Sequence, residues 1–186
     1  MSVKILSVAK QLPKHTRETK EIIPLVKLWM EGQETRFQRK VLKLFEGAGV
    51  DRRYSIMAAE EVFLNSSFEN KNDIYVREVT TLAEQSLKKS LKKASLQPTD
   101  IDYIITVSCT GIMIPSVDAY LINSLHMRQD VVRLPVTEMG CAAGVSGIIY
   151  AKNFLKANPN KRAAVIAVES PTATFQLEDF LSLIHI

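Results

Sequence analysis

The segment that decides the fold runs from Pro135 to Gly147 and reads PVTEMGCAAGVSG. An apolar run over Val131–Thr137 leads into it and predicts a β-strand, whereas the small and apolar residues of Ala142–Lys156 predict a helix. Cys141 therefore lies at a tight strand-to-helix turn. Backbone N–H groups at a helix start have no partner within the helix and carry partial positive charge, so this position favours a thiolate over a thiol.

The surroundings of Cys141 make it a candidate nucleophile. The N–H groups at the helix start can stabilise an oxyanion when the sulfur attacks a thioester. Four small neighbours leave room for backbone and substrate to approach closely, and these are Gly140, Ala142, Ala143 and Gly144. The alternative is that Cys141 is a small buried hydrophobe, as free cysteines often are. The spacing of the residues around Cys141 does not by itself distinguish this site from the nucleophile sites of other cysteine enzymes.

Strands and helices alternate along the rest of the chain. Near-continuous apolar runs predict buried strands at Ile101–Val107 and Ala163–Val168, and Val3–Ala9 is a third strand candidate. Helices are expected at Thr19–Met30, at Thr35–Ala48 with Gly47 and Gly49 closing it, at Asp73–Ala94, and from Pro115 to about Leu125. Pro135 argues against a central position for its strand. This alternation predicts right-handed crossovers and a largely parallel α/β sheet.

Composition indicates a soluble globular domain of 186 residues, with 46% hydrophobic residues, 24% charged residues and a net charge of +4. The two cysteines and the absence of a signal peptide favour the reducing cytoplasm. No apolar stretch is long enough to span a membrane, and no Cys and His spacing indicates a metal site. His15, His126 and His185 are isolated.

The basic run Lys88–Lys93 allows two interpretations. A solvated helix face is the favoured one. The positive charge could also attract nucleic acid or a small phosphorylated substrate. Nucleic acid is not expected, because the chain lacks interleaved aromatic residues and any recognition motif.

Four segments resemble the type III polyketide synthases, the chalcone synthase-like family, in its bacterial form. They read TEMGCAAG at 137–144, VSCTGIMIPSVD at 107–118, VESPTATF at 168–175 and GVDRRY at 49–54. The resemblance spans Val3 to about Phe180. It implies a thiolase-like α/β fold of two similar halves layered αβαβα, of which residues 1–180 are the N-terminal part. The last residues, 181–186, resemble a translated sequencing adapter, so we expect an artefactual tail.

The resemblance implies roles for individual residues. Cys141 would accept the starter acyl group. Cys109, Glu169 and Thr174 match positions that line the substrate cavity, although Cys109 could instead pack at a strand end. Ile114 matches a residue that reaches into the partner's cavity in the family's homodimer, and its bond to Pro115 is expected to be cis.

The last residue assignments concern two lysines and the positions at which this chain differs from the family. Lys40 and Lys43 match basic positions that hold coenzyme A phosphates in the family, and an exposed helix face is the competing interpretation. Gly47 occupies the third position of that basic cluster. Pro171 stands where plant members have threonine, which leaves the shape of the cavity open.

The implied reaction is a decarboxylative condensation of an acyl-CoA starter with malonyl-CoA units, giving a pyrone or resorcinol-type polyketide. It needs no metal, redox cofactor or carrier protein, because coenzyme A thioesters carry the substrates. The family's catalytic His and Asn lie in the second half of the fold, so we expect this chain alone not to condense substrates. The alternatives are a ketoacyl-acyl-carrier-protein synthase III and a catalytically silent scaffold of the same fold.

Overall fold

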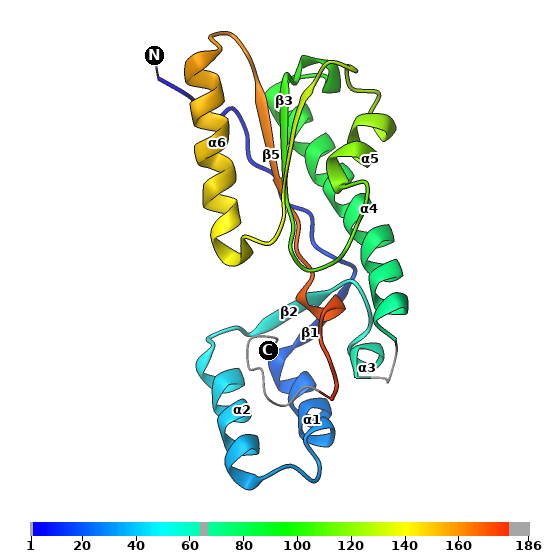
Figure 1. The fold of residues 1–186 in the computed structure, drawn as a ribbon. Helices are drawn as coiled ribbons and strands as arrows, with labels where there is room; N and C mark the ends of the chain where they lie inside the picture. The colour runs from blue at the N-terminus through cyan, green and yellow to red at the C-terminus, as the bar shows by residue number, and fades with distance from the viewer. Residues whose placement is uncertain (1, 64–66, 179–186) are drawn as a thin grey trace. The chain divides into compact units, whose positions relative to one another are not determined.

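The computed structural model describes residues 2–63 and 67–178, and the tail expected to be artefactual, 181–186, lies outside them. The chain divides into two compact units. Unit 1 combines Met1–Leu12 with Tyr75–Ser170, and unit 2 combines Pro13–Ile74 with Pro171–Ile186. Helix α4 (Phe68–Ala94) begins in unit 2 and continues in unit 1, and the other helices and strands each belong to one unit (Figure 1).

The centre of unit 1 is a parallel three-stranded sheet in the order β4-β3-β5. The strands are β3 (Tyr103–Val107), β4 (Val132–Val136) and β5 (Ala163–Ala167). All three were predicted from the sequence, and their parallel pairing confirms the predicted α/β architecture. Pro135 lies in β4, which is an edge strand of this sheet, as expected for a residue without a backbone N–H.

Helices cover both faces of this sheet (Figure 1). The connection from β3 to β4 contains α5 (Val117–Ser124), and the connection from β4 to β5 contains α6 (Ala143–Ala157). The two helices lie on opposite faces, because β4 and β5 flank β3 on opposite sides and both crossovers are right-handed. At Gly147 a Cβ would lie 3.1 Å from the Val165 side chain, so the small residues of α6 permit close packing on the sheet.

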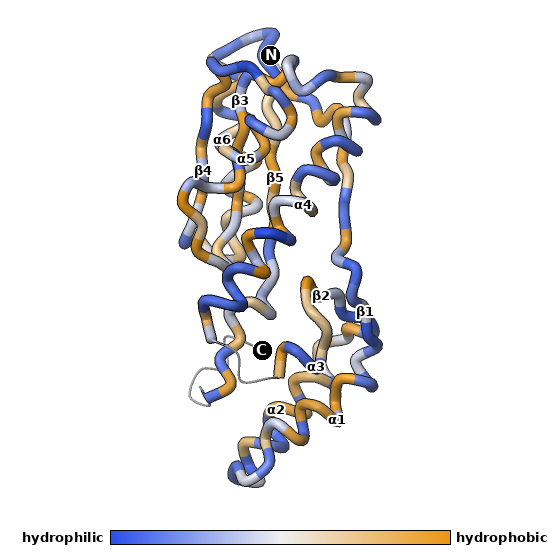
Figure 2. Tube along the Cα trace, turned by 90° about the vertical axis from the view of Figure 1, so that its right-hand side faces the viewer, coloured by the Kyte–Doolittle hydropathy of each residue, from blue (hydrophilic) through white to orange (hydrophobic). Residues whose placement is uncertain are grey.

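Unit 1 contains a buried apolar core on the α6 side of the sheet. Its members are Tyr103, Ile105, Val107, Val136, Ala143 and Ala151, with Leu134, Phe154, Ala163 and Val165 packed against them. Figure 2 shows β3 and β5 as hydrophobic along their length. All five residues of β3 are buried, as expected for a strand that is covered on both faces, whereas Ile166 is the one buried residue of β5, so the predicted full burial of that strand is wrong.

Helix α4 (Phe68–Ala94) is longer than the predicted Asp73–Ala94. Its buried side chains in unit 1 recur every four residues and are Tyr75, Val79, Ala83, Leu87 and Leu91. A short 3₁₀ turn at Pro98–Asp100 then leads to β3. Lys88, Lys89, Lys92 and Lys93 lie on the opposite, exposed face of α4, as the amphipathic pattern predicts.

The predicted strand at Val3–Ala9 is wrong. Residues 2–12 form an extended segment that is not part of either sheet. The carbonyl oxygens of Val8 and Ala9 accept hydrogen bonds from the side chains of Lys93 and Ser86 on α4, rather than from a neighbouring strand. The side chains of Ile5 and Val8 are 78% and 71% exposed, so the apolar character of the segment does not reflect burial in unit 1.

Unit 2 is mainly helical. It contains β1 (His15–Glu18), α1 (Thr19–Trp29), α2 (Thr35–Gly47), β2 (Arg52–Ser55), α3 (Ala59–Val62) and a 3₁₀ turn, η3 (Pro171–Ala173). Strands β1 and β2 pair antiparallel and were not predicted. Helices α1 and α2 pack through Val26, Met30 and Val41. Gly49 follows α2 with a φ of +62°, in agreement with its predicted role after the helix end.

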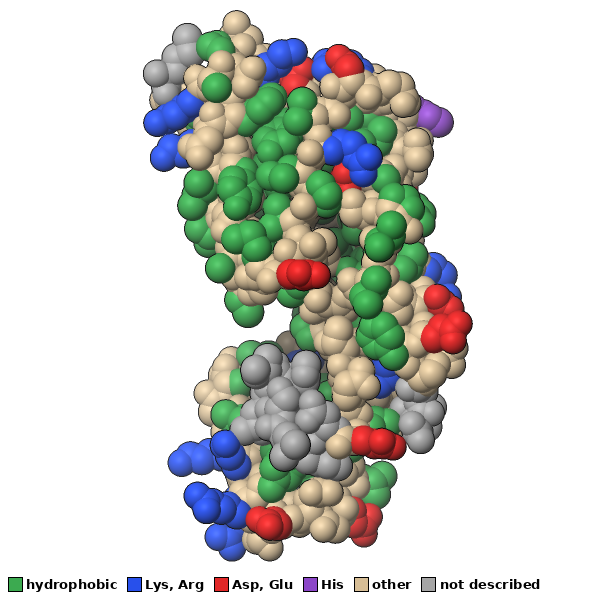
Figure 3. All heavy atoms as spheres, in the orientation of Figure 1, with side chains coloured by type: hydrophobic (Ala, Val, Ile, Leu, Met, Phe, Trp, Pro, Cys, Tyr) green, Lys and Arg blue, Asp and Glu red, His purple; other side chains and the backbone are tan. Residues whose placement is uncertain are grey.

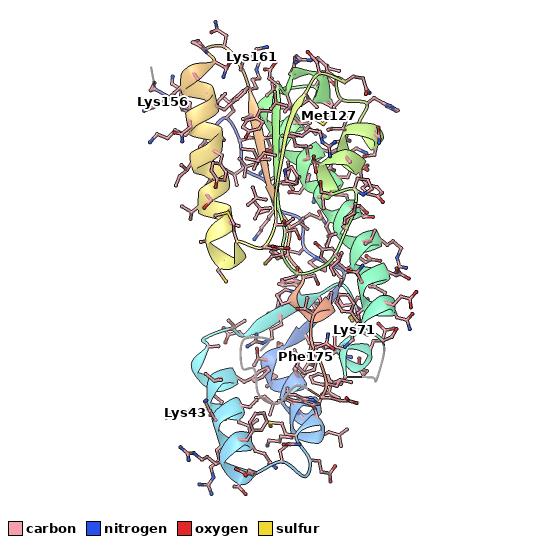
Figure 4. All side chains as sticks on the ribbon, in the orientation of Figure 1. Lys43, Lys71, Met127, Lys156, Lys161 and Phe175 are labelled. Atoms are coloured by element: carbon pink, nitrogen blue, oxygen red, sulfur yellow. The ribbon has the colours of Figure 1, made fainter. Side chains whose placement is uncertain are left out.

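Lys71, a buried lysine of α4, is hydrogen-bonded to the segment that follows η3. The Lys71 ammonium donates a hydrogen bond of 2.7 Å to the Phe175 carbonyl oxygen and lies 5.8 Å from the centre of the Phe175 ring. Figure 4 shows the two side chains lying close together. Burial lowers the pKa of Lys71. The Phe175 ring also packs edge-on against Trp29, so this segment is attached to α1 as well.

Hydrophobic side chains are exposed on the face of unit 1 that carries α6 (Figure 3). On that helix, Val145 is 63% exposed, Ile148 56% and Ile149 48%. An exposed apolar helix face of this kind favours association with another apolar surface. None of the helices within the described ranges has the length and apolar character needed to cross a bilayer.

Candidate active site

Cys141 lies in a short 3₁₀ turn, η2 (Gly140–Ala142), directly before the first residue of α6. Its side chain is exposed, and it is a free cysteine. Gly140 has a φ of +57°, a conformation that glycine adopts without steric cost. The strand-to-helix turn predicted from the sequence is therefore present, and the alternative of a buried packing residue does not describe this side chain.

The ends of the three parallel strands bring Cys109, Cys141 and Glu169 together. Val107, the last residue of β3, is paired with Val136 of β4 and Ala167 of β5. The three strands thus end at the same level. Cys109 and Glu169 each follow two residues after their strand, and Cys141 follows five residues after β4. This is the carboxyl edge of the sheet, where α/β proteins commonly place their functional residues.

The Glu169 carboxylate is held by the loop after β3. It accepts the backbone N–H of Cys109 at 3.0 and 3.1 Å and that of Thr110 at 3.1 Å. The Thr110 hydroxyl donates a further bond of 2.7 Å to the same carboxylate and accepts the Ser170 backbone N–H at 2.7 Å. Glu169 is exposed. These bonds fix its side chain against the backbone of Cys109.

Cys109 has an environment that opposes ionisation. The residue is exposed, but partial burial of its thiol raises the pKa, and the Glu169 carboxylate raises it further through both its charge and a hydrogen bond. Cys141 adds a smaller effect in the same direction, and the Gly140 backbone acts against it. Cys109 retains its proton over a wider pH range than an ordinary cysteine.

Tyr75 supports this loop from the core of unit 1 and was not recognised in the sequence. Its hydroxyl is hydrogen-bonded to the hydroxyl of Ser108, the residue before Cys109. Its ring lies against Gly111, where an added Cβ would be only 2.2 Å from the ring carbon Cδ1. Burial raises the pKa of Tyr75. Tyr75 lies four residues before Val79, and this helical spacing could have identified it as one of the buried side chains of α4.

The remaining predicted site residues are Ile114, Thr174, Lys40 and Lys43. Ile114 is 93% exposed in unit 1, and the Ile114-Pro115 bond is cis, as predicted. Thr174, Lys40 and Lys43 belong to unit 2. Thr174 donates its hydroxyl to the Pro171 carbonyl oxygen at 3.0 Å.

The two lysines are exposed on α2, where Figure 4 shows Lys43 projecting outward. A hollow of about 620 Å³ in unit 2 is lined by the GVDRRY segment and its neighbours, and neither lysine contributes to it. Within residues 2–63 and 67–178, no group of three or more His, Cys, Asp or Glu side chains is arranged to hold a metal ion.

Comparison with known families identifies the class of protein to which this fold belongs. The family described as FAE1/Type III polyketide synthase-like protein matches residues 8–178. The chain belongs to this family of thiolase-fold acyltransferases.

Individual relatives are consistent with this assignment. The 1,3,6,8-tetrahydroxynaphthalene synthase of Streptomyces griseus is 31% identical over 168 residues, which cover 90% of this chain and 45% of that protein. The crystal structure of the Streptomyces coelicolor A3(2) enzyme of the same name has a TM-score of 0.86 and 31% identity, and covers 93% of this chain and 50% of that one.

A mutant of CsyB, solved in complex with CoA-SH, shares the fold with a TM-score of 0.82 at 22% identity, covering 93% of this chain and 48% of that one. The chain spans about half the length of the relatives that it matches. It corresponds to the N-terminal half of the thiolase-like fold, as the sequence predicted.

Proposed function

We propose that this chain carries the nucleophile of an acyltransferase that condenses an acyl-CoA starter with malonyl-CoA units. The observation that supports this proposal is the position of Cys141, which is exposed at a glycine-initiated turn directly before a helix of 15 residues. A helix start supplies backbone N–H groups and partial positive charge, both of which favour a thiolate and a tetrahedral oxyanion.

In the first step, the Cys141 thiolate attacks the carbonyl carbon of the acyl-CoA thioester. The tetrahedral intermediate collapses, the bond to the coenzyme A sulfur breaks, and coenzyme A leaves as its thiol after taking up a proton. The acyl group remains on Cys141 as a new thioester. Because one thioester replaces another, the step needs no external source of energy.

In the second step, malonyl-CoA loses carbon dioxide, and the resulting enolate attacks the acyl-Cys141 carbonyl carbon. The new carbon–carbon bond lengthens the chain by two carbons and releases the Cys141 thiolate. Repetition gives a poly-β-keto chain that cyclises to a pyrone or resorcinol-type ring. Enolate formation in this family uses a His and an Asn from the second half of the fold, so we propose that this chain alone stops at the acyl-enzyme.

The remaining assignments are proposals on the same basis. Cys109, Glu169 and Thr174 line the cavity of the complete enzyme, and the exposed Ile114 reaches into a second copy in a homodimer. Lys40 and Lys43 hold the phosphates of coenzyme A. Their exposure on α2 leaves both ammonium groups accessible to such a ligand.

Acyl loading tests the proposed function directly. The purified chain is incubated with short-chain and long-chain acyl-CoA thioesters, and the acylated residue is identified by peptide mass spectrometry. We expect acylation of Cys141 that is lost in Cys141→Ser and retained in Cys109→Ser. Acylation of Cys109 alone, or of neither cysteine, would favour the silent scaffold. Polyketide formed by the chain with malonyl-CoA would contradict the proposed arrest at the acyl-enzyme.

A further inference from the structure

Unit 1 contains a second feature, separate from Cys141, that the acyl-transfer reaction does not use. It is a hollow of about 460 Å³ lined by Ala9, Lys10, Lys89, Lys92 and Lys93. The hollow forms where the extended N-terminal segment is hydrogen-bonded to side chains from the last turns of α4. We call this feature the lysine hollow.

Neutral groups hold the N-terminal segment in place. The Lys93 ammonium donates a hydrogen bond of 2.9 Å to the Val8 carbonyl oxygen, and the Lys89 ammonium donates one to Oε1 of Gln11. The Ser7 hydroxyl donates a hydrogen bond of 2.9 Å to the Ser90 carbonyl oxygen. These bonds keep Lys10 in the wall of the hollow together with lysines of α4. Each ammonium has three N–H donors, so Lys89 and Lys93 retain capacity for a further ligand.

The positive charge of the hollow is not neutralised by the protein. None of its four lysines forms an ion pair with a carboxylate in the described part of the chain, whereas the neighbouring Lys88 pairs with Glu84 at 2.5 Å. The negative end of the α4 dipole favours Lys92 and Lys93 in the last turn. The helix dipole does not account for the position of Lys10, which lines the same hollow but belongs to the N-terminal segment.

We propose that the lysine hollow binds a small anion that carries two or more phosphate groups. The four lysines that line the hollow largely with their aliphatic stems carry four positive charges, which match several negative charges better than one, and a lysine ammonium can donate charge-assisted hydrogen bonds to phosphate oxygens at the rim. The lining contains no aromatic side chain on which a base could stack, so the hollow favours a compact phosphate over a single-stranded nucleic acid.

Titration with inorganic pyrophosphate tests this proposal, with binding followed by isothermal titration calorimetry at constant ionic strength. The variant Lys10→Gln/Lys92→Gln removes two charges from the hollow. The matched control, Lys88→Gln/Lys156→Gln, removes two charges from lysines outside it. Thermal melts establish that both variants retain the parent fold, since all four positions are exposed.

We expect saturable binding of one pyrophosphate, an affinity lowered about tenfold in the hollow variant, and little change in the control. Orthophosphate should bind more weakly than pyrophosphate. Equal loss in both variants would overturn the proposal, because it would indicate diffuse attraction to the net charge. Absence of saturable binding, or tighter binding of a single-stranded oligonucleotide than of pyrophosphate, would also overturn it.

Discussion

The Glu169 carboxylate and the backbone N–H of Cys109 are hydrogen-bonded through both carboxylate oxygens, at 3.0 and 3.1 Å. A negative charge is thereby fixed beside one of the two cysteines of the site. It raises the pKa of the Cys109 thiol, in addition to the larger effect of burial. The two cysteines of this sheet edge should therefore differ in reactivity.

Iodoacetamide at neutral pH should alkylate Cys141 faster than Cys109. Only the thiolate reacts, and the raised pKa of the Cys109 thiol lowers its thiolate fraction. Peptide mass spectrometry over a time course measures both rates in one sample. Cys141→Ser is the control and should leave only the slow reaction. Equal and slow labelling of both residues would count against Cys141 as the nucleophile.

Replacing Glu169 by Gln should make Cys109 more reactive. A raised thiol pKa means less thiolate at a given pH, so removing the carboxylate charge lowers the pKa of Cys109 and shifts its labelling profile toward lower pH. The rate of alkylation as a function of pH is the measurement. Glu78→Gln removes a carboxylate from α4 and should leave the profile in place. An unshifted profile in Glu169→Gln would refute the assigned electrostatic effect.

Gly111→Ala should destabilise unit 1 by about 1–3 kcal/mol, because the added Cβ would lie 2.2 Å from the buried Tyr75 ring. The matched control is Gly144→Ala on α6, where an added Cβ meets nothing within 4 Å. Gly144 lies in the first turn of α6, so that change should stabilise by less than the value of about 0.5–1 kcal/mol that applies to a helix interior. Urea unfolding followed by circular dichroism compares the two. Similar midpoints for both variants would show that the loop adapts to the added carbon.

Arg133→Met should destabilise the protein by about 1–3 kcal/mol. The Asp118 side chain is fully buried and accepts a hydrogen bond of 2.6 Å from Nε of Arg133. Losing this cation leaves a buried carboxylate that accepts hydrogen bonds from the uncharged hydroxyl groups of Ser116 and Thr106. Arg77→Met, which breaks an exposed pair with Glu78, should change stability by less than about 0.5 kcal/mol. Equal effects in urea unfolding would argue against the buried pair.

The exposed apolar face of α6 should cause self-association of the isolated chain. Val145→Lys/Ile149→Lys places two charges on this face and should lower both aggregation and binding of an apolar fluorescent dye. Asn153→Lys adds charge at an exposed polar position of the same helix and serves as the control. Light scattering against protein concentration measures the effect. A monomeric parent chain with a cooperative melt would contradict the prediction.

Much of unit 1 could be predicted because its signals are local. Strands β3 and β5 are apolar runs, α4 has a clear helical period, and Cys141 lies between a strand and a run of small residues. The proline of β4 correctly indicated an edge strand. Each of these features depends on neighbouring residues rather than on distant ones.

The errors concern residues whose partners are distant in sequence. The segment Val3–Ala9 has the composition of a strand, yet its carbonyl groups bond to side chains of α4. Strands β1 and β2 read HTRE and RRYS, which contain no apolar alternation, so their pairing could not be predicted. The bonds between Glu169 and the loop of Cys109 join positions 60 residues apart, and the sequence contains no local signal for them.

Strands β3, β4 and β5 end at one level, and each contributes a single residue to the cysteine-containing edge through its own connection. An insertion or deletion in one connection would therefore move one side chain and leave the other two in place. Evolution could alter the shape of this edge in separate small steps, without rebuilding the sheet that supports it.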